Sequence, residues 1–134
     1  MKEKHKNMYM KIAEVMAETS SGVRLKVGSV IVKNNNIIST GYNALPEHID
    51  GPLEDENNVT RLEVRHAEKN ALMALIRSTE SAVGGTMFVT HGCCKMCSID
   101  IVDAGIKKVY YRHDYRDLSG IQYLIDNGVE VEKL

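Results

Sequence analysis

The sequence predicts an α/β fold: a three-layer α/β/α arrangement with a mixed five-stranded sheet and helices on both faces. Early in the chain, two apolar segments flank an asparagine-rich turn, which is typical of an antiparallel hairpin. In the second half, segments of strand length alternate with segments of helical period, which implies parallel pairing. A length of 134 residues suffices for one hydrophobic core but not for two, so residues 1–134 are expected to form one domain.

The first half of the chain predicts a helix followed by a hairpin. Apolar residues at helical spacing indicate a helix over residues 1–19, and Ser20-Ser21-Gly22 ends it. Residues 24–33 and 37–42 change to the period of strands, and Asn34-Asn35-Asn36 forms the turn between them. Antiparallel pairing of these two strands is the expected start of the sheet.

A long polar segment, residues 43–64, separates the hairpin from the second half and is expected to be a functional loop. The elements that follow are expected in this order: a helix over 65–81, a strand over 86–90, a helix over 94–104, a strand over 106–112, a helix from 118 to 128, and a strand over 129–134. Three methionines at helical spacing are expected to fill the core: Met8, Met16 and Met73.

The bulk composition excludes some classes of function. Hydrophobic residues make up 43% and charged residues 26%, an ordinary globular balance. The formal net charge of −1 argues against binding to nucleic acid or to an anionic membrane. No apolar run approaches the ~20 residues of a membrane span, and no apolar signal core follows the basic N-terminus, so a reducing cytoplasm is the expected location. The three cysteines cluster within five residues, which indicates metal binding rather than a disulfide framework.

Two short motifs carry the candidate chemistry, His66-Ala67-Glu68 and Cys94-Lys95-Met96-Cys97. Sulfurs at i and i+3 at a helix start can grip one ion, and one histidine with two cysteines leaves a fourth tetrahedral position open for water, as in catalytic zinc sites. Two alternatives stay open: the cysteines are simply core residues, or His91 or Cys93 closes a structural site.

Glu68 is the expected proton carrier, because zinc lowers the pKa of bound water to about 7 and a nearby carboxylate can then take its proton. Residues at i and i+2 point to nearly opposite sides of a helix, so His66 and Glu68 can converge only at its first turn. The alternative is a helix-start carboxylate that complements the dipole.

These motifs resemble those of the cytidine deaminase superfamily, whose signature is H-x-E followed by P-C-x-x-C. The chain looks most like the deoxycytidylate (dCMP) deaminases, over almost its full length, and the expected fold is therefore cytidine-deaminase-like. The resemblance extends to these segments: Met10-Lys11-Ile12-Ala13-Glu14-Val15, Val27-Gly28-Ser29-Val30-Ile31-Val32, Ser39-Thr40-Gly41-Tyr42-Asn43, His66-Ala67-Glu68-Lys69-Asn70-Ala71 and Ala104-Gly105-Ile106-Lys107-Lys108-Val109-Tyr110-Tyr111.

The resemblance implies zinc-dependent hydrolysis of dCMP to dUMP and ammonia, a reaction that feeds dTMP synthesis. It implies that His66, Cys94 and Cys97 bind Zn²⁺, that zinc hydroxide attacks C4, and that Glu68 passes protons to N3 and to the departing amine. Asn43 is expected to contact the sugar or base, unless it is only a turn asparagine. Ala67 is expected to contact the pyrimidine edge through its backbone. The resemblance also implies a homo-oligomer, a dimer or hexamer, and allosteric control by dCTP and dTTP with Mg²⁺.

The chain departs from the family pattern at two positions. Cys93 stands where proline usually precedes the first motif cysteine, and we expect it to pack in the core rather than to bind metal. Ala44 stands where glycine usually follows Gly-Tyr-Asn, which removes a permissive backbone position and argues against the dCTP and dTTP control.

A nucleotide phosphate needs cations near the 5′ end of the sugar. Ligands of open α/β sheets gather beyond the carboxyl ends of the strands, which favours the segment from Arg112 to Arg116, with Tyr115 as a stacking residue. Further candidates for phosphate or effector contacts are Arg24, Lys26 and Arg65.

Other functions stay open at this point. A dCTP-accepting enzyme, a nucleoside deaminase or a tRNA deaminase of the same superfamily would share the zinc motifs, although the acidic C-terminal segment is a poor handle for RNA. A non-catalytic binding module held together by zinc is the alternative from another class, and in such a module Glu68 would have no catalytic role.

Overall fold

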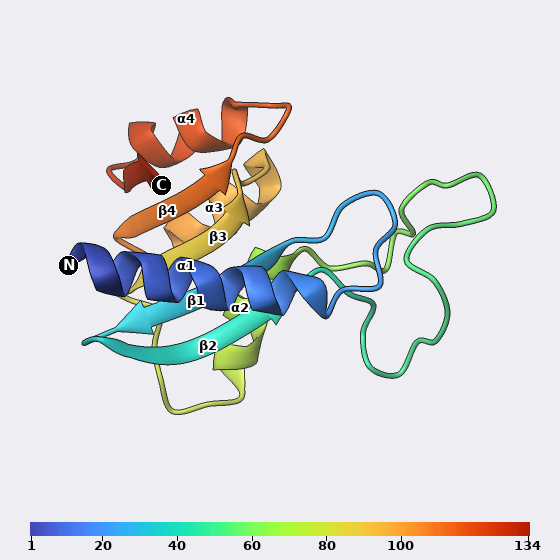
Figure 1. The fold of residues 1–134 in the computed structure, drawn as a ribbon, viewed down its shortest axis with the longest axis horizontal. Helices are drawn as coiled ribbons and strands as arrows, with labels where there is room; N and C mark the ends of the chain where they lie inside the picture. Colours follow the sequence, from blue (N-terminus) through green and yellow to red (C-terminus); the bar gives the residue numbers. More distant parts are fainter.

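The computed structural model describes all 134 residues and contains a five-stranded sheet between two layers of helices (Figure 1). The elements are α1 (Glu3–Glu18), β1 (Gly28–Lys33), β2 (Asn36–Tyr42), α2 (Ala67–Ile76), β3 (Thr86–His91), α3 (Lys95–Asp103), β4 (Lys108–His113), α4 (Ser119–Asp126) and β5 (Glu130–Lys133). No helix combines the length and the apolarity that a membrane crossing needs.

The sheet is mixed, as the sequence predicts. Its strand order is β2-β1-β3-β4-β5. β1 runs antiparallel to β2 and to β3, whereas β3, β4 and β5 run parallel to one another. The three-layer α/β/α architecture is therefore confirmed.

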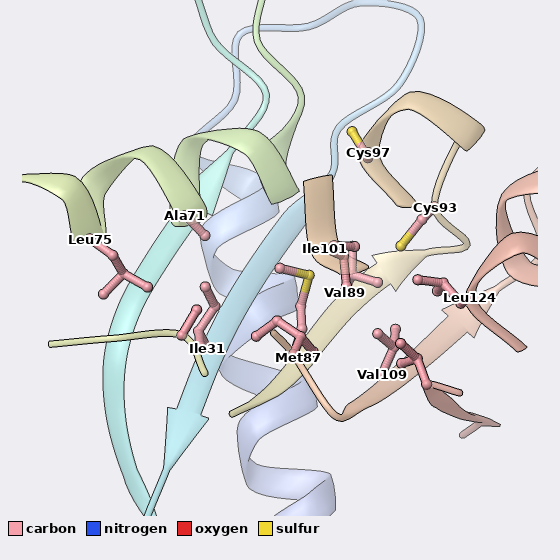
Figure 2. Packing of buried hydrophobic residues seen from close by; sticks show 13 residues of the cluster. Ile31, Ala71, Leu75, Met87, Val89, Cys93, Cys97, Ile101, Val109 and Leu124 are labelled. Atoms are coloured by element: carbon pink, nitrogen blue, oxygen red, sulfur yellow. The ribbon is translucent and has the colours of Figure 1, made fainter. Parts of the chain in front are cut away.

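Strand alternation divides the core between the two faces of the sheet. On one face, Val30, Phe88 and Tyr110 pack against Tyr9 and Met10 of α1. The opposite face carries the larger cluster, in which strand residues such as Ile31 and Met87 meet α2, α3 and α4 (Figure 2). The central strands β1 and β3 thus bury both of their faces, as strands covered by helices on both sides do.

Close backbone contacts fix the start of α2 on the hairpin. A Cβ atom on Gly41 would lie 2.4 Å from the carbonyl oxygen of Ala67, so only glycine permits this approach. The hydroxyl of Ser29 donates to the same carbonyl at 2.8 Å, and that of Ser39 donates to the carbonyl of Ala71 at 2.6 Å. The first turn of α2 is therefore held against β1 and β2.

Several element bounds differ from the sequence prediction. The helix expected over 65–81 covers only Ala67–Ile76, because the hydroxyl of Ser78 bonds to the carbonyl of Leu75 and the amide of Glu80 and so stabilises a turn in place of the helix. The strand expected over 24–33 begins at Gly28.

The prediction that the three methionines fill the core is wrong for two of them. Met8 is 44% exposed and Met73 is 40% exposed. The buried face of α1 is a different one from the face that carries Met8, and its residues are Tyr9, Met10, Ala13 and Ala17. Both faces of α1 carry apolar residues, so the sequence pattern indicates the helix but not which of its faces is buried.

Candidate metal centre and active site

The candidate metal ligands come from the N-terminal ends of two neighbouring helices. His66 is the residue before α2 and has an extended backbone, with φ −67° and ψ 159°. Cys94 holds the same position before α3, with φ −71° and ψ 163°, and Cys97 lies in the first turn of α3. Each helix therefore presents its positive end, with unpaired N–H groups, to the same point.

The three side chains converge on a volume that fits one zinc ion. Nδ1 of His66 lies 3.4 Å from Sγ of Cys94 and 3.4 Å from Sγ of Cys97. All three candidate ligand atoms lie within 4.8 Å of one another. Zinc bonds of about 2.3 Å to sulfur and 2.0–2.1 Å to nitrogen, at tetrahedral angles, separate ligand atoms by roughly 3.5–3.8 Å. The spacing and the soft donor set fit Zn²⁺ with one coordination position left over.

The electrostatics of the cluster favour a bound cation. A hydrogen bond from the thiol of Cys97, followed by one from His66, lowers the pKa of Cys94 to about 4. The same proton sharing raises the pKa of Cys97, and the hydrogen bond to Cys94 raises the pKa of His66. The lowered pKa favours the thiolate form of Cys94, which is the form that binds metal.

Glu68 lies in the first turn of α2, and its side chain is only 4% exposed. Because His66 stands outside the helix, the two side chains approach the same region despite their i, i+2 spacing. Burial raises the pKa of the Glu68 carboxyl, as suits a group that must hold and release a proton near neutral pH.

Neither alternative fourth ligand belongs to the cluster. Cys93 is fully buried in the core cluster that also holds Leu124 (Figure 2), and it is not among the three residues whose ligand atoms lie together. His91 bonds through Nδ1 to the hydroxyl of Thr90 and packs against the ring of His113, with ring centroids 5.0 Å apart. The packing role expected of Cys93 matches its place in the structure.

A cavity of about 510 Å³ opens in front of this cluster. It is lined by Arg24, Leu25, Val27, Asn43, Leu53, Glu54, Thr60, Val64, His66, Ala67, Glu68, His91, Gly92, Cys94, Asp114, Tyr115 and Arg116. The structure therefore brings five expected positions besides the ligands to one cavity: Arg24, Asn43, Ala67, Glu68 and Tyr115. Arg116, the last residue of the segment expected to bind phosphate, lines the cavity as well, and neither Arg24 nor Arg116 forms an ion pair.

Asn43 holds a neighbouring loop as well as lining the cavity. Its amide oxygen accepts a hydrogen bond from the amide of Val27 at 2.8 Å, and its amide nitrogen donates to the carbonyl of Leu25 at 2.8 Å. Its structural role in closing the strand is therefore evident in the contacts.

Three expected cations lie outside the cavity. Arg112 forms an ion pair with Glu14 of α1, because it shares the sheet face of Tyr110 rather than that of the cavity. Arg112 therefore lies away from the cavity, and its expected contact with the substrate stays a prediction. Lys26 and Arg65 also do not line the cavity, and the backbone of Arg65 pairs with Ala44 in an isolated bridge.

Sequence reasoning missed Glu54, Leu53 and Thr60, which line the cavity from the long loop. Glu54 is one of several acidic residues in this segment. The one local signal that it is buried is its apolar neighbour Leu53, which is buried as well.

Comparison with known proteins agrees with this geometry. A family model described as the cytidine and deoxycytidylate deaminase zinc-binding region matches residues 3–113. An uncharacterized deaminase of Aliivibrio fischeri is 36% identical over 103 residues, which cover 76% of this chain and 68% of that protein. The deoxycytidylate deaminase of Mycobacterium phage D29 is 33% identical over 117 residues, which cover 77% of this chain and 90% of that protein.

The deoxycytidylate deaminase of Saccharomyces cerevisiae is 31% identical over 135 residues, and this chain spans 43% of its length. Among solved structures, the dCMP deaminase of cyanophage S-TIM5, crystallised with dCMP and dUMP, is 44% identical with a TM-score of 0.98. That match covers 100% of this chain and 99% of the phage protein. From the family match, the relatives and the His/Cys/Cys cluster together, the chain belongs to the cytidine and deoxycytidylate deaminase family of zinc-binding enzymes.

Proposed function

We propose that this protein catalyses the hydrolytic deamination of dCMP, giving dUMP and ammonia. One observation carries the proposal: a zinc-sized His/Cys/Cys cluster and a buried glutamate form one wall of a cavity of about 510 Å³. The phage enzyme of the same fold was crystallised with both dCMP and dUMP, which supports this substrate and product.

His66, Cys94 and Cys97 would hold the zinc ion. When bound, zinc supplies a Lewis acid that makes water a nucleophile near neutral pH. Glu68 takes a proton from the attacking water onto its carboxylate and delivers it to N3 of the cytosine ring. A second proton then passes through Glu68 to the amine on C4, which leaves as ammonia.

The remaining walls of the cavity suit a small anionic nucleotide. Arg24 and Arg116 are the cations without a carboxylate partner there, and we assign the 5′-phosphate to them. Tyr115 lies under the guanidinium of Arg116, with 5.7 Å from the guanidinium carbon to the ring centroid, and would help to place that cation. Ala67 would contact the pyrimidine edge through its backbone, and Asn43 would position the loop that carries Arg24.

The assembly that we propose is a homo-oligomer, a dimer or a hexamer. The outer sides of α2 and α3 expose Met73, Ile76 and Met96, and a groove of about 350 Å³ runs between the two helices.

The location that we propose is the cytoplasm. All three cysteines are free, which suits a reducing compartment.

A substrate panel tests the function. Purified protein with its zinc content measured is assayed for ammonia release from dCMP, dCTP, deoxycytidine and a tRNA anticodon stem-loop. The expected result is one zinc per chain and the highest kcat/KM for dCMP. Preference for dCTP, for the nucleoside or for the RNA would overturn the assignment in favour of that substrate.

The same assay tests effector control by dCTP and dTTP with Mg²⁺. A change in rate at subsaturating dCMP would establish such control, whereas an unchanged rate would agree with the replacement of the usual glycine by Ala44.

A further inference from the structure

Glu54 is a buried acid that the proposed mechanism does not use. Its side chain is only 7% exposed, and it lines the same cavity as Glu68 and the metal cluster. Both carboxylate oxygens accept from a single donor, the backbone amide of Val23, at 3.1 and 3.2 Å. Glu54 forms no ion pair.

One amide donor leaves most of the hydrogen-bonding capacity of this carboxylate unused, because an ionised carboxylate offers about four acceptor sites. A buried acid without a cation is costly unless further donors reach it. Holding the loop in place does not account for the acid, since Asn43 already fastens the same loop through Leu25 and Val27. The unused acceptor sites lie on a cavity wall, where a bound ligand can supply donors.

The position of Glu54 selects the part of the ligand that it meets. Its partner Val23 precedes Arg24, the cation assigned to the phosphate, so Glu54 belongs to the wall formed by the 20–27 loop rather than to the metal cluster. Glu54 does not bind the phosphate, because a carboxylate repels it. It does not bind the exocyclic amine of the base either, because in the proposed mechanism that amine lies beside Glu68 and the metal ligands. Between the phosphate and the base, the remaining donor of a deoxynucleotide is the 3′-hydroxyl of its sugar.

We propose that Glu54 accepts a hydrogen bond from the sugar 3′-hydroxyl and is a specificity-determining residue; this inference rests on the proposed function. In a polynucleotide the 3′-oxygen is esterified, so that it cannot donate and it adjoins a negative phosphodiester. Glu54 therefore selects free nucleotides and disfavours nucleic-acid chains.

The test is a cycle that removes each partner in turn. kcat and KM are measured for wild type and Glu54→Gln with dCMP and with 2′,3′-dideoxycytidine 5′-monophosphate, which lacks the 3′-hydroxyl. Glutamine keeps an oxygen for the Val23 amide but loses the charge. We expect kcat/KM for dCMP to fall about tenfold, the size of a charge-assisted hydrogen bond, and kcat/KM for the dideoxy substrate to stay unchanged.

Glu56→Gln is the matched control, because Glu56 is an exposed glutamate of the same loop, and it should behave as wild type. Zinc content and melting temperature show whether the Glu54 variant is folded. If the Glu54 variant does not fold, two measurements on wild type decide instead. A kcat/KM that is much lower for the dideoxy substrate than for dCMP, together with poor activity on deoxycytidine 3′,5′-bisphosphate, would support the inference. Equal losses on both substrates, or no loss on either, would overturn it. If wild type fails to deaminate dCMP at all, the proposed function itself is wrong.

Discussion

The position at which a helix begins decides whether His66 and Glu68 can act together. Inside a helix, residues two apart face nearly opposite sides. In this protein His66 has an extended backbone and α2 starts at Ala67, so the imidazole turns back toward Cys94 while Glu68 stays buried beside it. The two residues therefore have separable roles, one in metal binding and one in proton transfer.

That separation gives a prediction for Glu68→Gln. The amide cannot accept the proton of water, so kcat for dCMP should fall by about 10²–10⁴-fold or more. The zinc ligands are untouched, so zinc per chain and melting temperature should stay at wild-type values. Cys94→Ala is the contrasting variant, and it should lose zinc and activity together. Full turnover in Glu68→Gln would favour a role for this carboxylate at the helix dipole only.

Residue type and spacing could predict the zinc ligands, because few side chains bind zinc and a one-turn spacing aligns two of them. Sequence could not show that Arg112 lies outside the cavity or that Glu54 lines it. The face of the sheet on which Arg112 lies depends on the strand register. Its ion pair with Glu14 depends on where α1 packs. Which acid of the long loop is buried depends on tertiary packing around Leu53 and Val23.

Among the secondary-structure elements, the order and type of all nine were predictable from periodicity and turn residues. The residues at which the elements begin and end were less predictable. α2 stops at Ile76 because Ser78 stabilises a local turn, and β1 starts late because Asn43 bonds to the preceding loop. Side-chain bonds of this kind depend on geometry that the hydrophobic pattern does not contain.

The contact between β2 and α2 gives a prediction at this scale. In Gly41→Ala the new methyl group would meet the Ala67 carbonyl at 2.4 Å, so α2 must shift away from the hairpin. We expect a loss of about 1–3 kcal/mol in the free energy of unfolding, measured in urea. Because Ala67 lies between His66 and Glu68, zinc affinity and kcat should fall as well.

Gly84→Ala is the control for this prediction. Gly84 has φ +76° and no atom near its would-be Cβ, so the variant should lose about 1 kcal/mol through backbone strain alone. Its zinc affinity and kcat should match wild type. If Gly41→Ala lost stability with unchanged zinc affinity and kcat, the hairpin would not be what positions the site.

At the scale of the whole molecule, the outer sides of α2 and α3 form a surface that could serve as a contact between copies of the chain. On α2, Lys69, Leu72, Met73 and Ile76 fall at i, i+3, i+4 and i+7 and so share one side. Lys69 pairs with Asp100 of α3 at 3.4 Å, which joins this row to the outer side of α3. Ile76 is 73% exposed and Met96 is 79% exposed, so apolar surface continues across both helices. An apolar surface of this kind marks an interaction site.

Ile76→Lys should therefore weaken self-association of the protein. We expect wild type to sediment as a species larger than its 15.0 kDa chain, and the variant to shift toward the monomer as protein concentration is lowered. A lysine desolvated at a symmetric interface meets its own copy, so it costs more than the apolar contact that it replaces. Val15→Lys, which places the same charge on the exposed side of α1, should leave the sedimentation unchanged. A monomeric wild type, or dissociation by Val15→Lys but not by Ile76→Lys, would contradict an interface on α2 and α3.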